Sequence, residues 1–180
     1  ISTKEILLKE KKNNNINFNL EKTFVSIGRL TRQKNFLFLI SNFKKFNYNQ
    51  KYNLLIIGEG EDGKKLKKFI NQNNMNKNVK IIGYQSNVYE YLRNCKCFIM
   101  SSLWEDPGFV LIEACYAGTP IISSDCMSGP KEILENGKNG LIFKSNNGES
   151  LLEKIELFEK LGVKDLQRFK FNAKSKSREF

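Results

Sequence analysis

The chain has 180 residues, of which 40% are hydrophobic, and its 14 phenylalanines are spread along it, so it can bury one core and is not a disordered chain. Its 30 Lys and Arg against 19 Asp and Glu give a net charge of +11. This charge favours anionic partners, such as nucleotides or a membrane face, although a solvated surface rich in Lys and Asn explains it as well. Because Arg is scarce and no aromatic-basic motif occurs, no nucleic-acid partner is expected.

The four cysteines and the absence of histidine argue against a metal site. Zinc sites need paired Cys or His at wider spacing than the single residue between Cys95 and Cys97. We interpret the cysteines as buried thiols, which suits a reducing cytoplasm. No apolar run approaches the roughly 18 residues that a membrane span needs.

A polar segment opens the chain, and short apolar runs then alternate with helical patterns. We expect residues 1–20 to be a linker or the end of a preceding domain, 21–163 to be one domain, and 164–180 to be a C-terminal helix that is cut short. The predicted strands are 24–27, 54–57, 79–82, 97–100, 120–123 and 141–143, and the predicted helices are 36–46, 64–70, 88–92, 107–117 and 151–158.

The strand runs are continuously apolar, which is typical of strands buried on both faces. Alternation of such strands with helices predicts an α/β fold with a Rossmann-like, doubly wound parallel sheet. Ligands bind such sheets outside the carboxyl ends of the strands. The residues that follow the strands are therefore the candidates for a site, and they are Arg29, Gly58–Gly60, Gly83–Tyr84, Ser101–Glu105 and Ser123–Pro130.

The predicted helix 107–117 is apolar after Gly108 except for Glu113. A lone carboxylate in a buried helix needs a partner, which is either a neighbouring protein group or a pair of ligand hydroxyls. The start of the helix offers the backbone amides of Gly108, Phe109 and Val110, and helix N-termini bind phosphate.

Two cations complete the anion site, and one acid stands beside it. Arg29 follows the first strand and Lys34 precedes the next helix, where a cation opposes the helix dipole, so the two form a candidate diphosphate clamp. Glu105 stands just before the anion-binding helix and would contact a sugar. Surface positions without a ligand are the alternative for both cations. Gly58-Glu59-Gly60 is equally compatible with a tight turn.

Taken together, these segments resemble the C-terminal half of a family 4 retaining glycosyltransferase of the GT-B fold, over residues 22–180. Two glutamates separated by seven residues are the family's signature. The matching segments are 26–30 with Lys34-Asn35, 57–60, 105–109 through Glu113-Ala114, 117–122, 128–133 and 136–141. One departure is Ser128-Gly129, where the family often has Gly-Gly beside the donor sugar.

The resemblance implies a role for each candidate. Arg29 and Lys34 would hold the donor diphosphate, and Glu105 would act near the anomeric carbon. The donor-binding set would be Gly58, Gly60, Tyr84 near the base, Gly108, the amides of Phe109 and Val110, and Glu113 on the ribose.

The activity so implied is transfer of a hexose-type sugar from a nucleotide diphosphate sugar, UDP-linked, to a hydroxyl acceptor in bacterial cell-surface glycan or glycolipid synthesis. No metal and no cofactor would take part. The acceptor would bind to an N-terminal domain of the same protein, so the 180 residues alone would not turn over.

Two alternatives stay open. One is a GT-B nucleotide-sugar epimerase, which the lack of histidine disfavours. The other is a non-catalytic basic module that binds nucleotides or an anionic membrane through the lysine-rich helix at 64–70. The expected location is the cytoplasm, including the inner face of the cell membrane.

Overall fold

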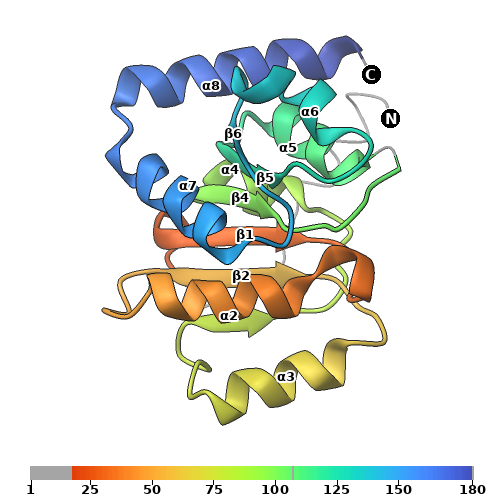
Figure 1. The fold of residues 1–180 in the computed structure, drawn as a ribbon, viewed down its shortest axis with the longest axis vertical. Helices are drawn as coiled ribbons and strands as arrows, with labels where there is room; N and C mark the ends of the chain where they lie inside the picture. Colours follow the sequence, from red (N-terminus) through yellow and green to blue (C-terminus); the bar gives the residue numbers. More distant parts are fainter. Residues whose placement is uncertain (1–17, 107, 180) are drawn as a thin grey trace.

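The structure is a computed structural model that describes residues 18–106 and 108–179. The linker predicted for residues 1–20 lies largely outside the described residues, and a 3-10 turn at Leu20–Lys22 leads into the first strand. Six strands form one parallel sheet in the order β3-β2-β1-β4-β5-β6 (Figure 1). They are β1 (Thr23–Ile27), β2 (Asn53–Ile57), β3 (Val79–Ile81), β4 (Cys97–Met100), β5 (Ile121–Ser124) and β6 (Leu141–Phe143).

The strand order reverses at β1. Its residue Val25 pairs with Leu55 of β2 on one side and with Phe98 of β4 on the other. The chain winds outward from β1 to β3 and then returns to β4 beside β1, which is the doubly wound topology. The predicted fold class is confirmed, and the switch point for ligands lies between β1 and β4.

Successive residues of a strand point to opposite faces of the sheet, and each face packs in its own hydrophobic core. Leu54 belongs to the core under the first group of helices and its neighbour Leu55 to the core under the second. This is why the strand runs are continuously apolar. The first face carries α2 (Phe36–Phe46), α3 (Gly63–Gln72) and α7 (Gly148–Lys160), and the second carries α4 (Tyr89–Asn94), α5 (Phe109–Ala117), α6 (Pro130–Ile133) and α8 (Val163–Lys176).

The lysine-rich helix α3 lies at one end of the molecule, and α8 lies at the other (Figure 1). Leu66 and Ile70 are buried in the first core, so the apolar stripe of α3 packs against the sheet. The side chains that α3 exposes to solvent include four lysines, Lys64, Lys65, Lys67 and Lys68. No helix within the described ranges is both long enough and apolar enough to cross a bilayer.

The four cysteines are buried and free, as predicted. Burial raises the pKa of both Cys95 and Cys115 to about 12. The thiols are therefore protonated core side chains at neutral pH.

Candidate functional site

A hollow of about 510 Å³ opens at the carboxyl ends of β1, β2 and β3, next to the start of α5. Its position beside the switch point is the expected place for a ligand in a doubly wound sheet. Acidic, basic, aromatic and amide side chains converge on it. The lining residues are Ile27, Gly28, Arg29, Ile57, Gly58, Glu59, Tyr84, Gln85, Ser86, Val88, Val110 and Glu113.

Close backbone packing shapes the floor of this hollow. The amide of Gly58 donates to the carbonyl of Gly83 at 2.8 Å, and a Cβ on Gly58 would lie 2.0 Å from the carbonyl oxygen of Gly28. A Cβ on Gly60 would lie 2.5 Å from the carbonyl oxygen of Leu30. The two glycines thus allow the loops after β1 and β2 to touch. Gly58 lines the hollow, whereas Gly60 packs against the loop after β1.

Beside the hollow lies an ion pair between Lys34 and Glu105. The Lys34 ammonium donates to both carboxylate oxygens, at 2.6 and 2.8 Å, and the hydroxyl of Ser102 donates to the same carboxylate. Glu105 is only 5% exposed. The aliphatic stem of Lys34 passes over Gly28, where an added Cβ would lie 3.0–3.2 Å from it. The lack of a side chain at Gly28 therefore opens the route by which Lys34 reaches Glu105.

The backbone around this ion pair is fixed across the switch point. Gln33 donates its side-chain amide to the carbonyl of Trp104 at 2.9 Å, and its own carbonyl accepts from the amide of Leu103 at 2.8 Å. The hydroxyl of Ser101 donates to the carbonyl of Lys34 at 2.8 Å. The loops after β1 and β4 therefore form one unit that holds both partners.

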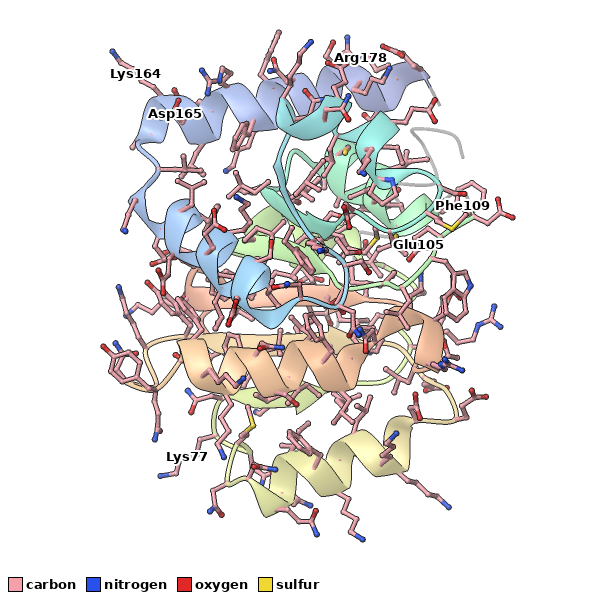
Figure 2. The ribbon with its side chains drawn as sticks, viewed as in Figure 1. Lys77, Glu105, Phe109, Lys164, Asp165 and Arg178 are labelled. Carbon is pink, nitrogen blue, oxygen red and sulfur yellow. The ribbon has the colours of Figure 1, made fainter. Side chains whose placement is uncertain are left out.

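The start of α5 lies next to Glu105. Helix α5 begins at Phe109 rather than at the predicted 107, because Gly108 takes the left-handed conformation with φ of 84°. The first amide to bond within the helix is that of Leu111, which donates to Gly108 at 2.8 Å, so the amides of Phe109 and Val110 precede the ladder. A Cβ on Gly108 would lie 3.5 Å from the Cβ of Glu105. Figure 2 shows Glu105 and the exposed ring of Phe109 at the same side of the molecule.

Glu113 projects from α5 onto the hollow and is half-buried. Burial raises the pKa of Tyr89, and the negative charge of Glu113 raises it further. The carboxylate therefore lies close enough to α4 to influence its first residue.

Eight of the ten predicted site residues fall into two adjoining groups, whereas Gly60 packs against Leu30 and the ring of Phe109 is exposed to solvent. Arg29, Gly58, Tyr84, Val110 and Glu113 line the hollow. Lys34, Glu105 and Gly108 form the cluster beside it.

Ser102 and Gln33 help to hold this cluster. Ser102 lies in the predicted candidate segment Ser101–Glu105 but had no assigned role there, and Gln33 lies outside every candidate segment. Within the described part of the chain, no three acidic or cysteine side chains gather as metal ligands would.

Comparison with known proteins identifies a matching family and several relatives. The family described as "Glycosyl transferases group 1" matches residues 9–176. An uncharacterised glycosyltransferase of Methanocaldococcus jannaschii is 45% identical over 114 residues, which are 62% of this chain and 28% of the relative. The N-acetylgalactosamine-N,N'-diacetylbacillosaminyl-diphospho-undecaprenol 4-alpha-N-acetylgalactosaminyltransferase of Campylobacter jejuni is 29% identical, covering 76% of this chain and 37% of the relative. The chain thus spans about a third of the length of these curated relatives.

Solved structures share the fold. A TarM variant of Staphylococcus aureus, crystallised with fondaparinux, alpha-GlcNAc-glycerol and UDP, superposes with a TM-score of 0.81 at 26% identity, over 93% of this chain and 34% of that one. HepE of Anabaena, in complex with UDP, gives a TM-score of 0.77 at 20% identity, over 88% of this chain and 44% of that one. Both are GT-B enzymes, which agrees with the sheet described above.

Proposed function

Because the chain belongs to the group 1 family of glycosyl transferases, we propose that it is the donor-binding domain of a retaining glycosyltransferase. The reaction moves a hexose-type sugar from a nucleotide diphosphate sugar to a hydroxyl acceptor. The observation that carries this proposal is the hollow at the switch point, which has Arg29 and Glu113 on its walls and the Lys34–Glu105 pair beside it.

The nucleoside fits the hollow by its chemistry. The half-buried carboxylate of Glu113 is an acceptor for two ribose hydroxyls, and such charge-assisted bonds contribute roughly 1.5–3 kcal/mol each. The exposed ring of Tyr84 offers a surface for the base. UDP is the proposed nucleotide, since the structures of TarM and HepE contain it.

The diphosphate lies between Arg29 and the start of α5. The guanidinium is a two-pronged donor for phosphate oxygens, and the amides of Phe109 and Val110 add the positive end of the helix dipole. Two donors of the Lys34 ammonium are used by Glu105, which leaves a third for a phosphate oxygen. Stabilisation of the leaving diphosphate by such fixed groups is commonly the largest catalytic contribution, and no metal is required for it.

The sugar extends towards Glu105. Its carboxylate is held by Lys34 and Ser102 next to the α5 start, so it is placed just beyond the proposed diphosphate site. Glu105 would contact the sugar near the anomeric carbon, where positive charge develops during transfer.

The remainder of the protein supplies the acceptor site in this proposal, as an N-terminal domain facing the hollow. The Campylobacter relative is named for an undecaprenol-linked acceptor, and another relative is named for amylovoran biosynthesis in Erwinia amylovora. We therefore propose that the whole protein acts in cell-surface glycan or glycolipid synthesis. A location on the cytoplasmic side is part of this proposal.

Calorimetric titration of the chain with UDP, ADP and GDP tests the proposal. We expect UDP to bind and EDTA to leave the affinity unchanged. Arg29→Ala should weaken binding, whereas Arg32→Ala should not, because Arg32 is also exposed but does not line the hollow. Failure of all three nucleotides to bind, or a tenfold loss on chelation, equivalent to about 1.4 kcal/mol, would contradict it.

A further inference from the structure

Helix α8 has one face buried and the opposite face open to solvent. Phe169, Ala173 and Ser177 turn inward, and Ala173 packs in the second core against the side of α5. Their spacing of four residues marks the inner face of a helix. On the outer face, Phe171 is 75% exposed. A phenylalanine so exposed in the middle of a helix contributes little to the fold.

Cations surround Phe171 on this outer face. Arg168 and Lys174 lie three residues before and after it, and Lys164 and Arg178 lie seven residues before and after it. All four are exposed. Arg178 lies in the 3-10 turn Ser177–Glu179 that continues α8, so the outer pair are separated by roughly 20 Å at 1.5–2 Å per helical residue. Figure 2 shows Lys164 near the start of α8 and Arg178 just beyond its end, both pointing away from the body of the protein.

The acidic residues of this segment lie to the side. Asp165 pairs with Arg168 at 3.1 Å, and Glu179 pairs with Lys176, which is not on the outer ridge. The outer face therefore carries more positive than negative charge, although Arg168 is paired with Asp165, and it has one large apolar side chain at its centre.

We propose that the outer face of α8 docks on an anionic lipid bilayer. The four cations would contact lipid headgroups, and the ring of Phe171 would enter the boundary between headgroups and acyl chains. A helix lying in the interface with cations beside an exposed aromatic residue has this pattern. A protein partner fits less well, because the centres of protein interfaces are depleted of lysine. A nucleic acid would use the cations but has no need of the protruding ring.

The charge set on α3 provides a matched control. Lys64, Lys65, Lys67 and Lys68 are four exposed cations on a helix at the other end of the molecule (Figure 1). No fully exposed aromatic residue accompanies them there, since Phe69 is partly buried in the first core. Replacing either set by Gln lowers the net charge equally.

The test is co-flotation of the chain with vesicles of phosphatidylglycerol and phosphatidylcholine, compared with phosphatidylcholine alone. We expect binding only to the anionic vesicles. Gln at positions 164, 168, 174 and 178 should weaken it by roughly tenfold or more. Gln at the four α3 positions should weaken it much less. Equal losses for the two sets would mean diffuse attraction by net charge and would overturn the proposal.

Insertion of the ring is tested by fluorescence. In a Trp104→Phe background, which removes the single native tryptophan, Phe171→Trp should give blue-shifted emission on anionic vesicles and quenching by brominated lipid. Tyr48→Trp, at a position that is 85% exposed on a different surface, should give neither. An unshifted spectrum for the Phe171→Trp variant, or duplex DNA binding tighter than vesicle binding at the same salt, would also overturn it.

The proposal is independent of the proposed donor site. The α8 variants keep every residue that lines the hollow, so UDP affinity should be unchanged in them. Loss of vesicle binding with UDP binding retained supports docking through α8, whereas loss of both indicates a folding defect in the variant. Phe171→Ser, which alters no charge, should then weaken vesicle binding while its thermal unfolding stays normal. Wild-type vesicle affinity in a folded Phe171→Ser variant would refute the role of the ring.

Discussion

The ammonium of Lys34 lies 2.6 and 2.8 Å from the two carboxylate oxygens of Glu105, a residue 71 positions further along the chain. The pair joins the loop after β1 to the loop after β4, at the place where the strand order reverses. Each partner carries a separate role in the proposed reaction, and each depends on the other for its position.

Replacing Lys34 should lower the free energy of unfolding more than replacing Glu105. Lys34→Met leaves a buried carboxylate without its cation and should cost about 3–5 kcal/mol of the free energy of unfolding. Glu105→Gln keeps an acceptor for Lys34 and Ser102 and should cost about 1–2 kcal/mol. Urea denaturation measures both. As a control, Lys154→Met removes the exposed pair with Glu153 and should cost less than about 1 kcal/mol. Equal losses of unfolding free energy for Lys34→Met and Lys154→Met would contradict the claim that burial makes the Lys34–Glu105 pair costly to break.

A second prediction concerns the contact between the loops after β1 and β2. Gly58→Ala would place a methyl group 2.0 Å from the Gly28 carbonyl oxygen, at a φ of 144°, and should cost at least about 3 kcal/mol in urea denaturation. Gly118→Ala is the control, because φ is 69° there but nothing lies within 4 Å of the added carbon. That change should cost only about 1–2 kcal/mol for the left-handed backbone. Similar losses at both positions would refute a steric role for Gly58.

Much of the fold could be predicted from local patterns. The six strands were predicted within one residue of their observed bounds, because each is a short run rich in apolar residues, and a Gly or Ser marks the end of every run except that of β6. The start of α5 was placed two residues early, since a proline such as Pro107 suits a first helical position, whereas Gly108 is left-handed here and the helix begins at Phe109. The four-residue helix α6 is too short for a periodic pattern and was not predicted.

The candidate site was predictable only in part, for a physical reason. Glu113 is the single charged residue of the apolar helix α5, so the sequence alone predicts that its carboxylate needs a partner. The pairing of Lys34 with Glu105 depends on β1 lying next to β4, and no local pattern encodes strand order. The bonds from Gln33 and Ser102 depend on that same adjacency. The assignment of roles to these residues stays a prediction.

The buried thiols give a third prediction. With pKa values of about 12 for Cys95 and Cys115 against an ordinary 9.0, the native thiols should not react with a thiol reagent at pH 8, and all four should react in urea. Because the folded thiols keep protons that unfolded thiols release, their contribution to stability should be lost as the pH rises above about 9. Rapid labelling of native protein would show that the core around α5 opens readily.

The ribose assignment gives a fourth prediction. Glu113→Ala should weaken binding of UDP by roughly tenfold or more, since two charge-assisted hydrogen bonds are lost. It should weaken 2′-deoxy-UDP much less, because that ligand already lacks one of the hydroxyls. Glu132→Ala, an exposed acid on α6, should alter neither affinity. Calorimetry with both ligands measures the difference, and equal losses for the two ligands would exclude the ribose as the partner of Glu113.

The last prediction separates the roles of Glu105 and Glu113. Glu105→Gln removes a negative charge beside the proposed diphosphate site and releases Lys34 from its ion pair. A charge near a helix end is worth about 0.3–1 kcal/mol, so UDP affinity should stay unchanged or rise slightly. The same change should weaken the intact UDP-sugar, because Glu105 is the proposed contact of the sugar.

In the full-length enzyme, Glu105→Gln should lower kcat and kcat/KM equally if its contact is made only in the transition state. Circular dichroism and urea denaturation of the variant provide the control for folding, since the ion pair also supports the loops. Loss of UDP binding by a folded Glu105→Gln variant would place this carboxylate at the nucleotide instead. Full activity of the enzyme without it would remove Glu105 from the reaction.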